Sequence, residues 1–186
     1  RTYVIKRAVN YFARKCFSQG ARLLHAGCGS GQVDTDISRE MRITALDISR
    51  HALRKYRKFN KEGTAVQGTI FQIPLGDHSV DGIYNLGVME HFPEEEIQKI
   101  LSEFHRVLKP NGAMIIFWPP EFGLSVFVLR AIHFVLNKVF RRRIQLHPDE
   151  MSRVKSREHA AAIFERARFK PVQYYFGFKD LFTHLV

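Results

Sequence analysis

Residues 23–32 read LLHAGCGSGQ, an apolar run that passes directly into three alternate glycines. The apolar run predicts a short buried β-strand. The glycines predict a tight loop at its end, because glycine accepts positive φ and leaves no Cβ between the backbone and a ligand. A helix beginning near Gln32 would present free N–H groups at the mouth of this loop. The stretch predicts a strand, a loop and a helix around a ligand, although a glycine loop alone also fits a simple tight turn.

An acidic residue follows this loop at a spacing that suits a nucleotide-binding fold. Residues 43–46 predict a second strand, which ends at Asp47, 20 residues beyond Gly27. Parallel strands end at a common edge of their sheet, and a carboxylate there can accept hydrogen bonds from both hydroxyls of a ribose. The glycines are spaced G-x-G-x-G, whereas dinucleotide-binding loops usually read G-x-G-x-x-G. The loop and Asp47 together favour a ligand that carries a ribose.

The rest of the chain alternates strands and helices. Helices are expected at residues 3–17, 32–40, 93–108 and 156–168 and directly after Ser49, and further strands at 64–67, 80–86 and 113–118. Residues 172–176 and 181–186 predict an antiparallel pair that finishes the sheet. The fold class is therefore α/β, with a doubly wound, mostly parallel seven-stranded sheet and an antiparallel last strand.

Several details of these elements can be predicted as well. Ser49 is expected to cap the helix that follows the second strand, and residues 109–112 (KPNG) to form a turn. The almost wholly apolar residues 113–118 favour a central strand covered on both faces. The first helix is amphipathic, and the residues expected near its apolar face are Val4, Ala8, Phe12 and Cys16.

The composition is that of one soluble globular domain of 186 residues, and no repeat or linker marks a boundary within 1–186. A surplus of 29 basic over 18 acidic residues gives a net charge of +11. It favours an anionic partner such as nucleic acid, a phospholipid surface or an acidic substrate, or it reflects solvated helix faces. The two cysteines, Cys16 and Cys28, allow no disulfide framework or thiolate zinc site and suit a cytoplasmic setting. Because the chain begins at Arg1 rather than Met, we interpret it as trimmed.

Six segments resemble, in order, the motifs of class I S-adenosylmethionine-dependent methyltransferases. They are residues 23–32, 43–49, 67–74, 79–85, 88–92 (VMEHF) and 106–113 (RVLKPNGA). The fifth is similar to the "LEH" of the small-molecule branch, and the sixth to the R-x-L-K-P-G-G signature before the fifth strand. Together they cover residues 21 to 119, and the ubiquinone/menaquinone-biosynthesis-like methyltransferases are the group that the chain resembles.

The resemblance implies S-adenosylmethionine as cofactor and S-adenosylhomocysteine as product, with Asp47 as the ribose-binding acid. The cofactor-binding residues that it implies are Gly27, Cys28, Gly29, Gly31, Asp47, Ile48, Thr69, Ile70, Leu86 and Gly87. Two positions depart from the family pattern. His25 stands where relatives usually carry an acid, and Thr69 stands where an Asp commonly meets the adenine amino group. Both substitutions favour, as an alternative, a catalytically weak cofactor-binding relative.

Methyl transfer from a sulfonium is an in-line displacement that depends mainly on holding the acceptor near attack distance and excluding water. A base is useful only when the acceptor must lose a proton. His91 follows the fourth predicted strand, so we interpret it as the catalytic base, with a structural histidine as the alternative. Glu90 is expected to orient its neighbours, and no metal ligand set is predicted.

Residues 120–150 are interpreted as a substrate-covering or membrane-facing insertion, and residues 1–20 as an N-terminal helix. Within 122–143 an apolar stretch ends in three arginines, and Arg130 and His133 argue against a transmembrane span. The segment can cover an apolar substrate or lie on an anionic membrane, or it can be a core helix with a solvated basic end. The protein would then be cytoplasmic, with membrane association as an option.

The leading hypothesis is methyl transfer to a small, apolar or lipid-like acceptor. A nucleic-acid methyltransferase suits the net charge of +11, but residues 85–88 (NLGV) do not resemble the tetrapeptide that grips a flipped base. Nucleic acid is therefore the less favoured partner.

Overall fold

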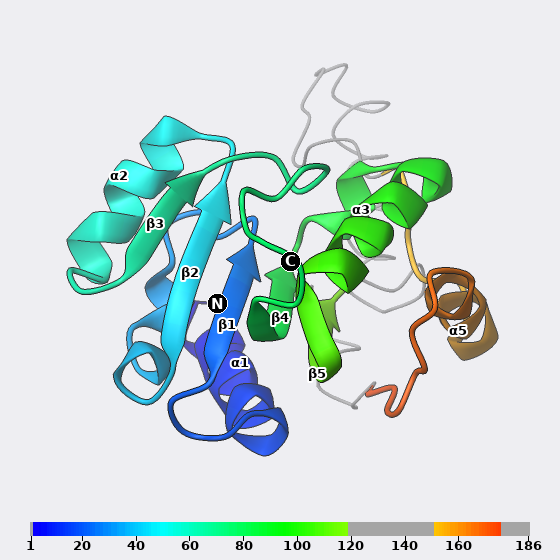
Figure 1. Ribbon diagram of the computed structural model, residues 1–186, viewed down its shortest axis with the longest axis horizontal. Coiled ribbons are helices and arrows are strands. Elements are labelled where there is room, and N and C mark those ends of the chain that lie inside the picture. Colours follow the sequence, from blue (N-terminus) through cyan, green and yellow to red (C-terminus); the bar gives the residue numbers. More distant parts are fainter. Residues whose placement is uncertain (1, 119–150, 176–186) are drawn as a thin grey trace, which may run out of the picture. The chain divides into compact units, whose positions relative to one another are not determined.

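The computed structural model describes residues 2–118 and 151–175 (Figure 1). The chain divides into two compact units, of which the first comprises Arg1–Leu86 with Lys99–Phe117 and the second Gly87–Gln98 with Trp118–Val186. The expected insertion at 120–150 and the expected last strand at 181–186 lie outside the described residues. No helix within the described residues is both long and apolar enough to cross a membrane.

A parallel sheet forms the centre of the first unit (Figure 1). Its five strands are β1 (Arg22–Ala26), β2 (Arg42–Asp47), β3 (Thr64–Gln67), β4 (Val80–Leu86) and β5 (Leu108–Phe117), in the order β3-β2-β1-β4-β5. The chain moves outward from β1 to β3 and then returns to pair β4 against the other side of β1. This reversal next to β1 is a topological switch point, where open α/β sheets bind their ligands.

The register brings the carboxyl ends of three strands together. Ala26 at the end of β1 pairs with Leu46 on β2 and with Asn85 on β4. The loop after β1 and the residue after Leu46 therefore lie at the same edge of the sheet, as the sequence predicted for Asp47.

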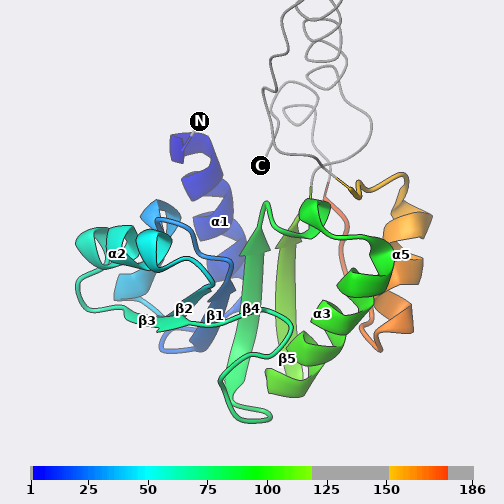
Figure 2. The same ribbon diagram turned by 90° about the horizontal axis from the view of Figure 1, so that it is seen from above.

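One face of the sheet is covered by α1 (Thr2–Cys16), two short 3₁₀ helices and α2 (Arg50–Phe59) (Figure 2). The α1 helix is confirmed, and its predicted apolar face is right in part. Ala8 and Phe12 are half-buried, whereas Cys16 is exposed, and the fully buried stripe is Val9, Ala13 and Phe17. Gly82 of β4 selects this neighbouring stripe, because its missing side chain leaves the space that the Phe17 ring fills: a Cβ on Gly82 would lie 2.1 Å from that ring.

The helix expected at residues 32–40 is instead two 3₁₀ helices, η1 (Gln32–Asp34) and η2 (Ile37–Arg39). Asp34, the last residue of η1, and Ile37, the first residue of η2, are both fully buried. The two short helices therefore each direct one side chain into the core.

The other elements agree closely with the pattern. Ser49 caps α2, accepting a hydrogen bond from the Ala52 amide at 3.2 Å. Helices α3 (Glu94–Val107) and α5 (Arg157–Arg166) are confirmed, and Ser156 caps α5. Residues 64–67 and 80–86 form β3 and β4 as expected.

The expected turn at residues 109–112 lies inside β5, which begins at Leu108. Val80 pairs with Leu108 but Gly82 pairs with Ala113, so the extra residues bulge out of the ladder. Asn111 has a φ of 64°, a left-handed conformation that Asn tolerates better than most residues. Residues 113–118 are half-buried rather than fully covered, and β5 is the last strand of the described sheet.

The expected strand at residues 172–176 is not formed by its described part, 172–175. These residues are irregular, and Val172 is 91% exposed. The segment expected to pair with it lies outside the described residues.

Candidate functional site

The glycine loop between β1 and η1 is held in left-handed backbone conformations. Gly27, Gly29 and Gly31 have φ values of 75°, 54° and 60°. A Cβ on Gly29 would meet nothing within 4 Å, so the backbone there is open to an approaching ligand. A Cβ on Gly31 would lie 2.1 Å from the Tyr56 ring. The first position leaves room for a ligand, and the second is required by packing against α2.

The amides of this loop are engaged within the protein. The N–H groups of Gly27 and Cys28 both donate to the Leu46 carbonyl at 2.9 Å, and that of Gly31 donates to the Cys28 carbonyl at 2.9 Å. The Gly29 N–H donates to Asp47 at 2.8 Å. The sequence predicted a short helix at residues 32–40 with free N–H groups at its mouth. In the structure these four N–H groups donate to acceptors within the protein. The loop is therefore poorly suited to a pyrophosphate, because a pyrophosphate is bound by free backbone donors.

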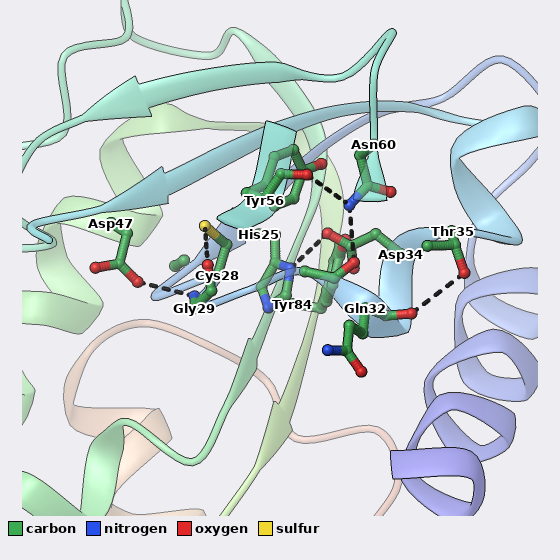
Figure 3. Close-up of polar contacts among 12 residues, drawn as sticks. His25, Cys28, Gly29, Gln32, Asp34, Thr35, Asp47, Tyr56, Asn60 and Tyr84 are labelled. Atoms are coloured by element: carbon green, nitrogen blue, oxygen red, sulfur yellow. Dashed lines mark hydrogen bonds and ion pairs between the residues drawn. The ribbon is translucent and has the colours of Figure 1, made fainter. Parts of the chain in front are cut away.

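The carboxylate of Asp47 lies at the tip of β2 and joins the loop to α2. Its Oδ2 accepts the Gly29 N–H at 2.8 Å (Figure 3). Its Oδ1 accepts the Ser49 N–H, also at 2.8 Å. Each carboxylate oxygen carries two lone pairs, so each retains one for a further donor. Asp47 is half-exposed. It can therefore accept hydrogen bonds from two neighbouring hydroxyls while it holds the loop in place.

The remaining implied cofactor residues of the first unit have different environments. Ile48 is 74% exposed beside Asp47, an open apolar surface that suits a flat base. Thr69 accepts a hydrogen bond from the Phe71 amide at 3.2 Å, so one lone pair of its hydroxyl is already engaged. The side chain of Ile70 is 7% exposed and belongs to the core, and Leu86 is half-buried at the end of β4.

A buried polar cluster lies beneath the loop (Figure 3). The Nδ1 of His25 lies 2.8 Å from Asp34 Oδ2, and the Tyr84 hydroxyl donates to Asp34 Oδ1 at 2.8 Å. Asp34 is 0% exposed and His25 is 2% exposed. The His25 and Tyr84 rings stack with their centroids 4.4 Å apart. Burial, followed by the nearby Asp34 carboxylate, raises the pKa of Tyr84 well above its usual value, so the Tyr84 hydroxyl keeps its proton and donates a hydrogen bond to Asp34.

Asp34 is the buried partner of His25. The family resemblance implies an acid at the position of His25, and η1 places the Asp34 carboxyl group against the imidazole that stands there. An acidic side chain therefore lies under the loop as part of a His25–Asp34 pair. Sequence reasoning missed Asp34, although a histidine inside an apolar strand signals that a buried partner is needed.

The sequence analysis also missed two residues that support the loop: Tyr56 within α2, and Asn60 directly after it. Asn60 is buried and donates from Nδ2 to the Gly31 carbonyl at 2.9 Å, which fixes the end of the loop. Tyr56 packs against Gly31, and burial raises the pKa of its hydroxyl. Asn85 of β4 performs a similar task, donating to the Ala26 carbonyl at 2.8 Å.

The Cys28 side chain occupies the loop as a small buried group. It is 5% exposed, and its thiol donates to the Gly29 carbonyl at 3.6 Å. Burial, and then the Asp47 carboxylate, raises the pKa of this thiol far above its usual value. The thiolate needed for nucleophilic attack is therefore disfavoured at neutral pH.

Gly87 and His91 belong to the second unit. His91 ends the 3₁₀ helix η3 (Met89–His91) and is half-buried. Residues 151–152 hold the backbone of η3 by two hydrogen bonds. The Met151 N–H donates to the Glu90 carbonyl at 2.7 Å, and the Ser152 hydroxyl donates to the Met89 carbonyl at 3.0 Å. Among the described residues, no three potential ligands of a metal ion come together.

The packing at Gly31 predicts a stability difference between two glycine variants. Gly20→Ala should destabilise by about 1–2 kcal/mol, because Gly20 has a φ of 80° but open space around a new Cβ. Gly31→Ala should cost more, because the same backbone penalty is joined by a clash with the Tyr56 ring. Urea denaturation of both variants measures the difference, and equal losses would show that Tyr56 moves aside.

Comparison with known proteins shows the family. A family model described as a methyltransferase domain matches residues 24–116, half of the chain. The chain belongs to this methyltransferase family. It is 29% identical over 122 residues to an uncharacterized methyltransferase of Synechocystis sp., a match covering 60% of this chain and 56% of the relative. It is 31% identical over 116 residues to the "Probable S-adenosylmethionine-dependent methyltransferase" of Mycolicibacterium smegmatis, covering 61% of this chain and 43% of that protein.

Two further similarities are to a curated enzyme and to a solved structure. A sterol 24-C-methyltransferase of Gibberella zeae is 30% identical over 117 residues, covering 58% of this chain and 30% of the enzyme. The solved structure of the YcgJ protein from Bacillus subtilis superposes with a TM-score of 0.63 at 21% identity, covering 87% of this chain and 67% of that one. The α/β methyltransferase fold is thus confirmed. The chain spans about half the length of the curated relatives that it matches.

The methyltransferase domain fits S-adenosylmethionine as its methyl donor. The open backbone at Gly29 leaves room for this donor. The two remaining lone pairs of Asp47 can accept hydrogen bonds from its ribose hydroxyls, and the exposed Ile48 offers an apolar surface to its adenine. This donor has a ribose and an adenine but no phosphate, in agreement with a loop whose amides are already engaged.

Proposed function

We propose that this protein transfers the methyl group of S-adenosylmethionine to a small, apolar or lipid-like acceptor by in-line displacement. The observation that carries the proposal is Asp47, which accepts the Gly29 and Ser49 amides and keeps one lone pair on each oxygen. When bound, the cofactor supplies an electrophilic methyl group. The residues proposed to hold it are Gly27, Cys28, Gly29, Gly31, Asp47, Ile48, Thr69, Ile70, Leu86 and Gly87.

Within this set the contributions differ by chemistry. Asp47 would bind the ribose hydroxyls, and the open face of Gly29 would admit the ligand close to the backbone. Ile48 would contact the adenine, whereas Ile70, being buried, would contribute through its backbone and through packing. The Thr69 hydroxyl can accept one more hydrogen bond and would meet the adenine amino group.

His91 is the proposed general base. It is half-buried, and its imidazole forms no hydrogen bond with another described residue. An imidazole can remove a proton from a hydroxyl or amine as the new bond to carbon forms. Positioning of the acceptor and exclusion of water would supply the remaining acceleration.

The apolar acceptor is proposed on two grounds. A sterol methyltransferase is among the relatives, and the apolar segment 122–143 follows β5, where a substrate-covering element is expected. The quinone-biosynthesis-like branch, suggested by the VMEHF motif, is the finer assignment that we favour. Assays with sterols, isoprenoid quinols and small phenols, scored by formation of S-adenosylhomocysteine, test the acceptor class. Turnover with RNA and with none of these compounds would contradict it.

Asp47→Ala tests the cofactor site. It should weaken S-adenosylhomocysteine binding by about 1–3 kcal/mol, the usual loss for a charged hydrogen-bond acceptor. The loss should fall near the upper value, because Asp47 also holds the Gly29 amide. Asp36→Ala is the matched control, since Asp36 pairs with Lys6 on the surface, and should leave the affinity unchanged. Calorimetry showing equal affinities for both variants would remove Asp47 from the site.

A further inference from the structure

A hollow of about 730 Å³ opens at the edge of the sheet opposite the glycine loop. Its lining includes the first residues of four strands: Arg22 of β1, Arg42 of β2, Thr64 of β3 and Val80 of β4. The loop and Asp47 follow the last residues of β1 and β2. All lining residues belong to the first unit. A volume of this size suits a small ligand, for which pockets span about 300–1,000 Å³.

The charge around this hollow is strongly positive. Five cations line it, Arg22, Arg39, Arg42, Lys58 and Lys61, against one carboxylate, that of Glu62. Arg22 has a carboxylate, that of Asp81, at 4.0 Å. The other four cations form no ion pair with another described residue, and all four are exposed. A cluster in which like charges outnumber the nearby carboxylates favours an anion. It also accounts for part of the net charge of +11, for which methyl transfer gives no reason.

The same hollow has hydrogen-bonding groups and an exposed aromatic ring. Asn60 is 5% exposed, and its Oδ1 has no hydrogen-bond partner in the described part of the protein. The buried Ser79 hydroxyl likewise lacks one there. Phe59, at the end of α2 between Lys58 and Asn60, is 48% exposed. Cations beside an exposed aromatic ring form the combination that binds a phosphate and stacks a base.

We propose that this hollow is a nucleotide-binding site, in which Arg39, Arg42 and Lys61 contact phosphate and Phe59 stacks on the base. The nucleotide can be free or one unit of single-stranded RNA. The Asn60 amide oxygen and the Ser79 hydroxyl are suited to the polar edge of the base or to the sugar. Because the hollow lies at the edge opposite Asp47, the proposal concerns recognition and does not require RNA to be the methyl acceptor.

The test is anisotropy of a fluorescein-labelled oligouridylate with the whole protein, in excess S-adenosylhomocysteine so that nucleotides do not compete for the Asp47 site. Alanine at Arg39, Arg42 and Lys61 together should weaken binding at least tenfold and reduce its salt dependence. Alanine at Lys99, Lys155 and Lys170, also exposed, removes the same charge and should change binding less than about threefold. Phe59→Ala should weaken it about fivefold or more with the salt dependence retained.

Unlabelled AMP distinguishes the two sources. Competition by AMP would show that a single nucleotide occupies the hollow, whereas binding of the oligonucleotide without such competition would show that a strand is required, and either result supports the site. Equal weakening by the two triple variants would overturn the proposal, since it would show attraction to net charge alone. Absence of oligonucleotide and AMP binding, with melting temperatures intact, would also overturn it. Calorimetry with S-adenosylhomocysteine separates this outcome from failure of the methyltransferase proposal, because it reports on the Asp47 site and not on the hollow.

Discussion

Asp34→Ala is expected to lower the free energy of unfolding by about 2–5 kcal/mol, because a buried group left without its hydrogen-bond partner costs about 1–3 kcal/mol and Asp34 has two such partners. Asp34 is 0% exposed and meets both His25 and the Tyr84 hydroxyl at 2.8 Å. Its loss would leave an imidazole and a phenol buried without their acceptor, together with a cavity under the loop. Urea denaturation measures the change.

Asp77→Ala is the control for this result. Asp77 is also an ion-pairing aspartate, with Arg106, but its side chain is 68% exposed. Surface pairs contribute about 0–1 kcal/mol, so the variant should stay close to the wild type. If Asp34→Ala were no more destabilising than Asp77→Ala, the buried cluster would not support the loop as described.

His91→Ala is expected to lower kcat by about 10²-fold or more if the acceptor is a hydroxyl or an amine, the range for loss of a general base. With a carbon acceptor the loss should be small. Cofactor affinity and melting temperature should change little in either case, because His91 is half-buried at the end of a short 3₁₀ helix. Steady-state kinetics with S-adenosylmethionine and the best acceptor measures the effect.

His105→Ala, which removes an exposed histidine of α3, should keep the wild-type kcat. A His91→Ala protein with a markedly lower melting temperature would identify His91 as a packed structural residue. The assignment of the base would then be wrong.

The parallel strands and the loop were predictable because their signals are local. A strand buried in a parallel sheet reads as a short apolar run, and β1 and β2 are built around such runs. The left-handed φ values of Gly27, Gly29 and Gly31 agree with the residues present, since few other residues adopt them readily. The predicted position of Asp47 beside the loop is confirmed, because a single crossover connects the adjacent parallel strands β1 and β2, whose ends lie at the same edge.

The errors arose where distant residues decide the local structure. Periodicity could not choose between two adjacent apolar stripes on α1, because the choice depends on the space that Gly82 leaves for Phe17. Nor could it show that Asp34 would be drawn under the loop to meet His25, which winds residues 32–39 into 3₁₀ turns instead of an α-helix. Gly82 and Phe17 lie far apart in the sequence, and His25 and Asp34 are brought together only by the fold.

Calorimetric titration of the intact protein with S-adenosylhomocysteine tests the central claim most directly. We predict one binding site with a dissociation constant in the micromolar range. NAD should not bind there, because the amides of Gly27, Cys28, Gly29 and Gly31 are engaged inside the protein and leave no cradle of free donors for a pyrophosphate. Binding of NAD together with no detectable binding of S-adenosylhomocysteine would contradict the account.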